Sequence, residues 1–287
     1  MSEGIFIPKP NYIKEIFDTE RAIIGMVHLK PLPGAPYYNG ESLKKVYDFA
    51  MSDVHALENA GVDGIIIENA WDIPFSKPED IGFETVAAMS TITEKIKQQT
   101  HLKIGINCLA NGALQALAVA KATEVSFVRV NQWVNAYVAN EGFVEGASAK
   151  AMRYRSQIKG ESIKVFADVH VKHGSHSIIA DRGLADQTHD NIFFDADVLI
   201  ATGSRTGNET EVGELKGIKE NSNLPVIVGS GMTVDNAEKI LSIADGCIIG
   251  SSLKVDGKWW NPVDEMRVRE FIGKVRDTPI KGENQMG

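Results

Sequence analysis

Short apolar runs alternate with amphipathic segments of helical period along almost the whole chain. Eight of the runs have the length and the β-branched composition of buried strands, and most of them end in a polar or small residue. The predicted strands cover residues 22–28, 64–68, 103–108, 126–130, 164–171, 197–201, 226–228 and 247–249. The predicted helices between and after them cover residues 42–59, 84–98, 112–122, 148–158, 184–193, 209–219, 234–241 and 262–275.

Eight strand-plus-helix units in order, without an internal linker, predict an α/β fold built as a single (β/α)₈ TIM barrel. Gly61 is a natural stop for the first of these helices, and Thr233 with Asn236 predicts an N-cap that opens the helix at residue 234. We expect the barrel to span residues 21–277, after a short N-terminal extension over residues 1–20 that packs on its bottom. Residues 278–287 are expected to form a tail.

The connection over residues 131–146 is longer than a simple link between a strand and a helix requires. It carries Trp133, Tyr137 and Phe143, so we interpret it as a candidate lid. Trp259 and Trp260 precede the last helix, where they either form part of a homo-oligomer interface or pack against the barrel wall.

Composition narrows the range of partners. The 287 residues are 43% hydrophobic and 24% charged, as in an ordinary globular protein, and the net charge is −8. Without a basic run, nucleic acid is not an expected partner, and a membrane surface is not favoured. The two cysteines, Cys108 and Cys247, are predicted to be buried and reduced. No signal-peptide pattern and no transmembrane segment is recognisable, so the expected location is cytoplasmic.

Two small-residue turns end the last two predicted strands. Their glycines let backbone N–H groups approach an anion closely, and barrels commonly hold phosphate at the loops after strands seven and eight. Gly203 and Ser204 form a similar turn after the sixth strand. The residues predicted to bind phosphate are therefore Gly203, Ser204, Gly229, Ser230, Gly231, Gly250 and Ser251. For each turn, a plain connection between strand and helix is the alternative.

The fifth predicted strand carries three ionisable residues on one face. Side chains alternate along a strand, so Val165, Ala167, Val169 and Val171 suit the helix layer, while the intervening positions face the barrel interior or its mouth. These intervening residues are Phe166, Asp168, His170 and Lys172. Burying three ionisable groups is costly without a purpose, so we predict that Asp168, His170 and Lys172 are catalytic. His173 and His176 in the following loop are weaker candidates.

The same parity places polar residues at the ends of other strands. Glu68 is predicted to be catalytic, and His28, Asn107, Arg129, Asn131 and Thr202 are predicted to bind substrate. Simpler interpretations stay open for several of them. Arg129 and Glu68 would also suit a structural ion pair, the two asparagines would also satisfy loop backbone groups, and His28 would also suit a packed position.

These residues fit more than one chemistry. In the first, Asp168 or Glu68 is a general base beside a carbonyl, and Lys172 or His170 stabilises the oxyanion. In the second, Glu68, Asp168 and His170, with or without His28, bind a divalent metal that activates water. In the third, Lys172 forms a Schiff base. No His-x-His pair or His-Glu-x-x-His helix is present, so the metal is the weaker hypothesis and no cofactor is required by the sequence.

Four segments together closely resemble the BtpA/SgcQ family. They are residues 24–36 (IGMVHLKPLPGAP), Glu68-Asn69, residues 168–173 (DVHVKH) and residues 201–204 (ATGS). The resemblance spans nearly the whole chain and implies a barrel of the ribulose-phosphate-binding type. The family name comes from a cyanobacterial member implicated in photosystem I biogenesis, whereas other members belong to non-photosynthetic organisms or to a sugar-uptake gene region. It implies the fold and a phosphorylated ligand rather than a reaction.

The sequence therefore predicts a cytoplasmic barrel enzyme that acts on a small phosphorylated sugar or nucleotide-like metabolite. Proton transfer, isomerisation and lyase-type chemistry all fit the residues. A metal-dependent hydrolase and a non-catalytic assembly factor for a membrane complex are the alternatives.

Overall fold

A closed parallel β-barrel forms the centre of the molecule. The computed structural model describes residues 8–202 and 209–276, and within them eight parallel strands close in the order β1-β10-β9-β8-β7-β4-β3-β2. These strands are β1 (Ala22–His28), β2 (Gly64–Glu68), β3 (Lys103–Asn107), β4 (Phe127–Val130), β7 (Lys164–Asp168), β8 (Val198–Ala201), β9 (Val226–Val228) and β10 (Gly246–Ile249). The predicted (β/α)₈ barrel is confirmed.

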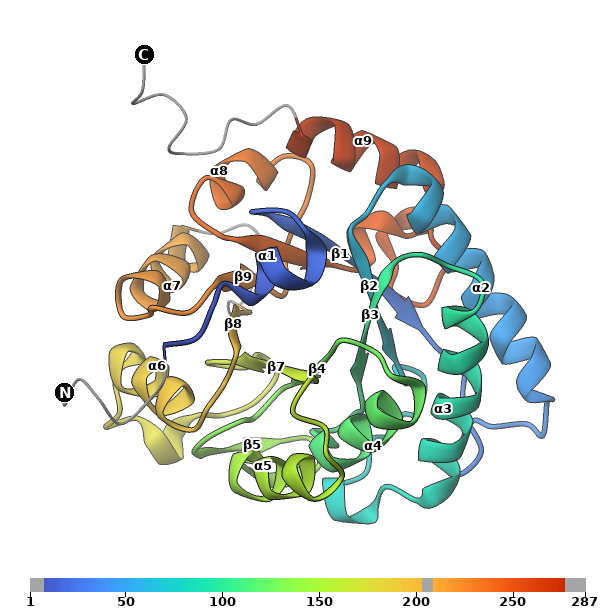
Figure 1. Cartoon of the computed structure of the whole chain (residues 1–287), viewed down its shortest axis with the longest axis horizontal. Coiled ribbons are helices and arrows are strands. Elements are labelled where there is room, and N and C mark those ends of the chain that lie inside the picture. Colours follow the sequence, from blue (N-terminus) through green and yellow to red (C-terminus); the bar gives the residue numbers. More distant parts are fainter. Residues whose placement is uncertain (1–7, 203–208, 277–287) are drawn as a thin grey trace.

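Helices follow the strands and surround the barrel (Figure 1). They are α2 (Leu43–Ala60), α3 (Phe83–Lys97), α4 (Ala113–Thr123), α5 (Ser148–Gln157), α6 (Leu184–Phe193), α7 (Glu209–Glu220), α8 (Ala237–Leu241) and α9 (Glu265–Arg276). Short 3₁₀ helices η1 (Pro78–Asp80), η2 (Ser177–Ile179), η3 (Ser251–Leu253) and η4 (Val255–Gly257) lie in the connections.

Several predicted element boundaries are wrong by one residue and three by more, one of which is the start of the last helix, at Glu265 instead of residue 262. β7 ends at Asp168 instead of continuing to residue 171, so the strand alternation does not extend to the residues beyond it. α8 begins at Ala237 instead of residue 234. Thr233 and Asn236 do exchange hydrogen bonds, at 2.8 Å and 3.4 Å, but these bonds hold a turn ahead of the helix.

Alternating side chains divide the core into two layers. One parity fills the barrel with a cluster that includes Ile24, Ile66, Phe127, Phe166, Val198, Ile227 and Ile248. The other parity, including Val165, Ala167 and Val169, packs against the helices as predicted. Val171 was expected there too, but it lies past the end of β7 and packs with Tyr137 and Val144. Gly105 makes room for the barrel cluster, because a Cβ on it would lie 2.2 Å from the Phe127 ring.

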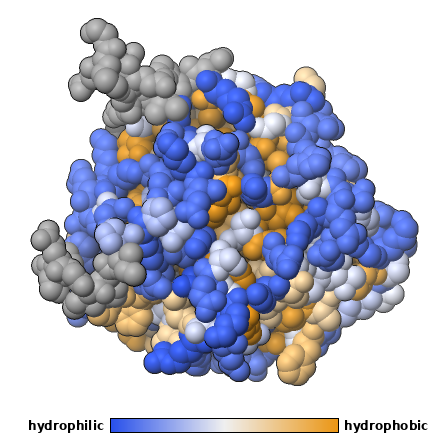
Figure 2. All heavy atoms as spheres, viewed as in Figure 1, coloured by the Kyte–Doolittle hydropathy of each residue, from blue (hydrophilic) through white to orange (hydrophobic). Residues whose placement is uncertain are grey.

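The N-terminal helix α1 (Tyr12–Phe17) closes one end of the barrel (Figure 1). Ile13 and Phe17 join the cluster inside the strands, and the Phe17 ring meets the Phe127 ring edge-on with 5.7 Å between centroids. Hydrophilic residues cover most of this face of the molecule (Figure 2). The helix therefore leaves the opposite end, where the strands finish, as the open mouth.

The candidate lid is an antiparallel hairpin of β5 (Ala136–Ala139) and β6 (Gly142–Glu145). Trp133, at its base, is completely buried, and its Nε1–H donates to the Phe194 carbonyl oxygen at 2.9 Å. Phe143 on β6 is exposed. The first aromatic residue is thus a core anchor, and the movement of a lid stays a prediction.

Both cysteines are buried free thiols, as predicted, and burial raises the pKa of Cys108 to about 12. Across the described part of the chain, no helix has both the length and the apolar character that a membrane span needs.

A buried ion pair links the connection after β10 to helix α2. Lys254, after η3, and Asp53, on α2, each have side chains only 1% exposed, and their Nζ–Oδ2 distance is 2.7 Å. The other carboxylate oxygen of Asp53 accepts the backbone N–H of Val263 at 2.7 Å, just before α9. One carboxylate therefore fixes the connection between β10 and α9.

Removing one partner of this pair leaves the other charge buried without compensation. We expect Asp53→Ala to lower the free energy of unfolding by about 3–5 kcal/mol, measured by urea denaturation. The double change Asp53→Leu with Lys254→Met should recover much of that loss, because it removes both charges. Lys44→Met, which breaks an exposed pair with Asp48, is the control and should change little. An Asp53→Ala protein as stable as the wild type would contradict this account.

Candidate functional site

A cavity of about 780 Å³ opens where the barrel strands end. The lining comes from β1, β2, β3, β4 and β10, from the loops after β2, β3, β4, β7, β9 and β10, and from the start of α9. Of the predicted site residues, the lining includes His28, Glu68, Asn107, Arg129, Asn131, Lys172, Gly229, Ser230, Gly231, Gly250 and Ser251. The structure thus brings most of the residues predicted from separate strands into one space, but Asp168, His170 and Thr202 are not among the residues that line it.

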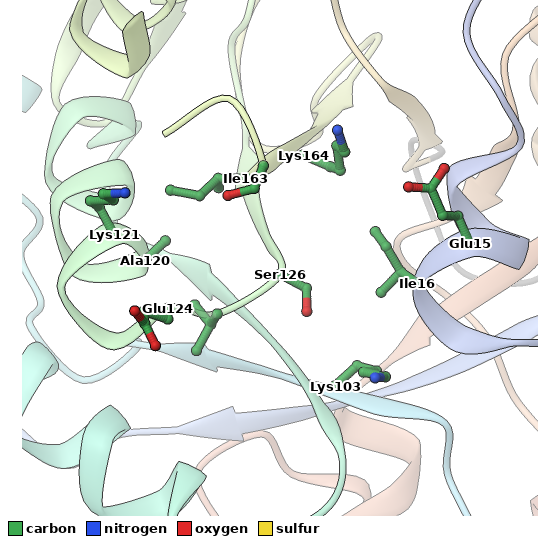
Figure 3. A pocket seen from close by; sticks show the side chains of 11 residues that line it. Glu15, Ile16, Lys103, Ala120, Lys121, Glu124, Ser126, Ile163 and Lys164 are labelled. Carbon is green, nitrogen blue, oxygen red and sulfur yellow. The ribbon is translucent and has the colours of Figure 1, made fainter. Parts of the chain in front are cut away.

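A second cavity, of about 450 Å³, lies at the opposite end of the barrel, near α1 (Figure 3). It is lined by the exposed side chains of Lys103 and Lys121 and the half-buried side chain of Lys164, with Glu15 and Glu124. Lys121 and Lys164 donate to nearby carbonyl oxygens, and none of the residues predicted to be catalytic lies there. The chemistry at the strand ends makes the first cavity the candidate site.

The two turns predicted to clamp phosphate lie side by side, because Cys247 of β10 is registered with Val228 of β9. The Ser252 hydroxyl donates to the Met232 carbonyl oxygen at 2.6 Å, which ties one turn to the other. Gly231 has a φ of +75°, a conformation that favours glycine. A Cβ on Gly229 would lie 2.4 Å from Ile200 and 3.3 Å from Arg129. Gly203 and Ser204 lie outside the described residues.

Lys172 connects the loop after β7 to the first of these turns. Its Nζ donates a hydrogen bond to the Ser230 hydroxyl, so an ammonium group lies directly at the glycine turn. A cation, a hydroxyl and close-packed backbone amides form an arrangement that can bind an anion. Lys172 also favours the ionised forms of Glu68 and Asp168 through its charge.

Glu68, at the end of β2, is buried at the floor of the cavity. Burial raises the pKa of its carboxyl, and the charges of Arg129, Lys172 and Lys254, with a hydrogen bond from Asn107, oppose that rise. The Asn107 amide donates to Glu68 Oε2 at 2.6 Å. A buried carboxyl with a raised pKa holds a proton more readily than a free one, which suits general acid–base chemistry.

His28, at the end of β1, faces Glu68 with 3.7 Å between its Nε2 and Glu68 Oε1. Its Nδ1 lies 3.0 Å from the Trp259 carbonyl oxygen, which can only accept, so Nδ1 carries the proton. Burial and the Lys254 charge lower the pKa of His28 to about 4. The neutral imidazole therefore presents an unprotonated Nε2 toward the carboxyl.

Aromatic side chains support this histidine. The Trp259 ring meets His28 edge-on at 5.8 Å and Trp71 at 5.3 Å. Lys30 places its Nζ 4.0 Å from the centre of the Trp71 ring and 4.3 Å from that of Phe49. The cation lies within reach of both aromatic faces. Trp259 thus packs against the barrel wall, which was one of the two expectations for it, whereas Trp260 is 45% exposed.

Arg129 and Asp168 form a buried ion pair between β4 and β7. Two parallel hydrogen bonds, of 3.1 Å from Nε and 3.0 Å from Nη2, join the guanidinium to the carboxylate. The Asn131 amide donates to the same carboxylate at 3.2 Å. Burial raises the pKa of Asp168, and these contacts oppose the rise; the bidentate geometry is that of an ionised pair. The partner of Arg129 is therefore Asp168 rather than Glu68.

His170 does not continue the face of Asp168, because β7 has already ended. Its ring stacks on His176 with 4.0 Å between centroids, and its Nδ1 lies 3.9 Å from Glu214 of α7. Its side chain is 36% exposed and is not among the residues that line the cavity. Thr202 donates its hydroxyl to the His170 carbonyl oxygen at 2.8 Å. The structure thus places His170 and Thr202 beside the cavity rather than in it.

Several residues that line the cavity were not predicted to belong to the site. They are Arg267 of α9, Met232 and Trp259, the last of which was considered only for an interface or for packing on the barrel wall. Lys254 is not among the lining residues, but its charge lowers the pKa values of His28 and Glu68. A lysine directly after the last strand and two tryptophans before the last helix were visible signals, but Arg267 lies in an ordinary amphipathic helix that gives no such signal.

A metal site was the weaker hypothesis. In residues 8–202 and 209–276, no three His, Cys, Asp or Glu side chains are grouped closely enough to hold a metal ion. Asp168 directs both of its oxygens to Arg129 and Asn131. His28 and Glu68 are the nearest approach to a ligand pair.

Comparison with known proteins identifies the family. The model of the BtpA family matches residues 19–277. An uncharacterized protein of Methanocaldococcus jannaschii is 40% identical over 88% of this chain and 94% of its own length. Photosystem I biogenesis protein BtpA of Synechocystis is 34% identical over 90% of this chain and 89% of its own length.

A solved structure, thiamine phosphate pyrophosphorylase from Pyrococcus furiosus, is similar with a TM-score of 0.54. The similarity covers 93% of this chain and 99% of that one, and the sequence identity is 14%, so it bears on the fold alone. The family model covers most of the chain and the Synechocystis relative is similar over nearly its whole length. This chain therefore belongs to the BtpA family.

Proposed function

We propose that this protein is an enzyme that binds a small phosphorylated sugar or nucleotide-like metabolite and moves a proton on it. The observation that carries the proposal is the position of Lys172 on Ser230, at the glycine turns, in the same cavity as the buried Glu68 carboxyl. The phosphate is held at the turns after β9 and β10. The reacting part of the ligand lies over Glu68, His28 and Arg129.

The anion-binding half is supported by charge and by backbone geometry. Gly229, Gly231 and Gly250 bring backbone close to the cavity, and Lys172 contributes a positive charge. A cation and backbone amides together are the usual means of holding a phosphate group.

The reactive half is supported by the difference between the two carboxylates. Asp168 directs both of its oxygens to Arg129 and Asn131. Glu68 accepts a hydrogen bond from Asn107 with one oxygen and faces the unprotonated Nε2 of His28 with the other. Two carboxylates in different environments are suited to separate roles. We assign proton transfer to Glu68, and stabilisation of negative charge on the ligand to Arg129 and Lys172.

The floor of the cavity also favours a ligand with hydroxyl groups. The amide oxygens of Asn107 and Asn131 are buried and have no hydrogen-bond partner among the described residues. A buried acceptor without a donor costs about 1–3 kcal/mol, and a small shift of either side chain would let a ligand hydroxyl supply the donor. This favours a phosphorylated sugar over a ligand whose reacting end carries only acceptors.

The Synechocystis relative supplies a second candidate function, because its name is that of a photosystem I biogenesis protein. A non-catalytic assembly factor would use the outer surface of the barrel and would not need the chemistry of Glu68. Replacement of Glu68 by Gln therefore separates the two functions: the enzyme loses its cellular role, and the assembly factor keeps it.

The charge of Lys172 should contribute directly to phosphate affinity. A hydrogen bond to a charged group contributes about 1.5–3 kcal/mol, so Lys172→Met should weaken binding by about tenfold to a hundredfold. Calorimetric titration with a panel of sugar phosphates measures this. Lys103→Met, in the cavity at the other end of the barrel, is the matched control and should bind as the wild type does. The proposal fails if no phosphorylated compound binds, or if the two variants bind equally well.

Glu68→Gln should block proton transfer while leaving binding largely intact, because the amide keeps the size of the side chain. Loss of a general acid–base group lowers the rate by about 10²–10⁴-fold. The readout is incorporation of deuterium from D₂O into the carbon-bound positions of the sugar phosphates that bind, followed by NMR. Exchange at the wild-type rate in Glu68→Gln would exclude the assigned role.

The depressed pKa of His28 predicts a dependence of stability on pH. The unfolded chain binds a proton near pH 6.5, whereas the folded protein resists protonation until about pH 4. The stabilisation is therefore complete above pH 6.5 and is lost as the pH falls toward 4, by about 3 kcal/mol in total. We expect the unfolding free energy of His28→Gln to fall less steeply over this range, measured by denaturant titration. Parallel pH profiles for the two proteins would rule out the buried neutral histidine.

A further inference from the structure

We infer that Arg267, in the first turn of α9, is a second phosphate-binding residue and makes the site selective for phosphomonoesters over phosphodiesters. The inference rests on the proposed function, since it assumes that the turns after β9 and β10 hold a phosphate. It adds a residue from a different element and a narrower class of ligand.

Arg267 lines the same cavity as the two turns. Its Nη1 lies 3.5 Å from the Ser252 carbonyl oxygen, and its Nε lies 3.7 Å from Asp264 Oδ2. Both contacts are longer than the roughly 2.7–3.2 Å of an ordinary N–H···O bond. The guanidinium is therefore placed beside the second turn by weak contacts that a stronger acceptor, such as a phosphate oxygen, can replace.

The start of α9 is fixed against the second turn, which makes this placement specific. The Asp264 N–H donates to the Leu253 carbonyl oxygen at 2.9 Å, and Leu253 belongs to η3. Asp53 binds both Lys254 and the Val263 N–H, so the buried ion pair anchors the same junction. Asp264 Oδ1 accepts the backbone N–H of Met266 at 3.0 Å and caps the helix. Arg267 thus projects from a rigid base.

The two cations reach the clamp from different directions. Lys172 comes from the loop after β7 and contacts Ser230, whereas Arg267 comes from α9 and contacts Ser252. A phosphomonoester has three free oxygens, so the amides of the turns, the ammonium and the guanidinium can each take one. A phosphodiester replaces one of these oxygens with an ester group that neither cation can bind. An arginine fork is also well matched to two oxygens of a phosphate.

The acidic groups near Arg267 leave its guanidinium available to a phosphate. Glu68 is engaged by Asn107 and lies at the end of β2. Asp264 is the acidic residue closest to Arg267 in the contacts of that side chain, at 3.7 Å, and its other oxygen is used as the helix cap. Arg267 is thus left with positive charge to offer an anion.

Calorimetric titration with inorganic phosphate, glycerol 3-phosphate and the methyl phosphodiester of glycerol 3-phosphate tests the inference. The wild type should bind the monoester at least about tenfold more tightly than the diester. Arg267→Gln should weaken monoester binding by about tenfold to a hundredfold, the effect of losing a hydrogen bond to a charged group. It should weaken diester binding much less, because the diester lacks the third free oxygen that the guanidinium would bind. Arg267→Lys should fall between the two, since it keeps the charge and loses the fork.

Arg269→Gln is the matched control, because Arg269 lies two residues along α9 and pairs with Glu265 on the surface. It should bind both ligands as the wild type does, and unchanged melting temperatures should show that every variant folds. If Lys172→Met loses phosphate binding and Arg267→Gln does not, the inference is overturned and the proposed function stands. If the wild type binds neither inorganic phosphate nor glycerol 3-phosphate, both are overturned.

Discussion

The buried pairing of Arg129 with Asp168 is the constraint on which the mouth of this barrel depends. A carboxylate and a guanidinium taken out of water must satisfy each other, and two parallel hydrogen bonds with a third from Asn131 do so here. The pair joins β4 to β7, the two strands on either side of the hairpin β5–β6 in the sequence. Because Asp168 is committed to this pair, the nearby carboxyl that stays available for chemistry is Glu68.

The remaining parts of the site follow from the same requirement that buried charge be compensated. Arg129 and Lys254 both act on Glu68, and Lys254 is itself compensated by Asp53, which also fixes the start of α9. The Arg129–Asp168 pair therefore stabilises the floor of the cavity. The Lys254–Asp53 pair stabilises the junction before α9, which carries Arg267. The turns that we propose to bind phosphate line the same cavity, where Lys172 contacts the first turn and Arg267 contacts the second.

Much of this arrangement could be predicted from the sequence. The order of eight strand-plus-helix units predicts the barrel. The period-two pattern predicts the inward face of β1, β2, β4 and β7 and the convergence of His28, Glu68, Arg129 and Asp168 at one end, because side-chain parity is a local property. The period-two pattern fails after Asp168, because β7 ends there instead of at residue 171 and His170 leaves the expected face. The partner of Arg129 and the place of Arg267 depend on packing between distant elements, which no local pattern records. The glycine turns are visible in the sequence, but what lies beside them is not.

The central claim is that a phosphate group binds at the turns after β9 and β10. The most direct measurement is a crystal structure of the protein soaked with inorganic phosphate. The account predicts an anion between the turns at Gly229–Gly231 and Gly250–Ser252, within hydrogen-bond distance of Lys172. Clear density for those turns without an anion at saturating phosphate, or an anion bound instead in the lysine-lined cavity beside α1, would contradict it.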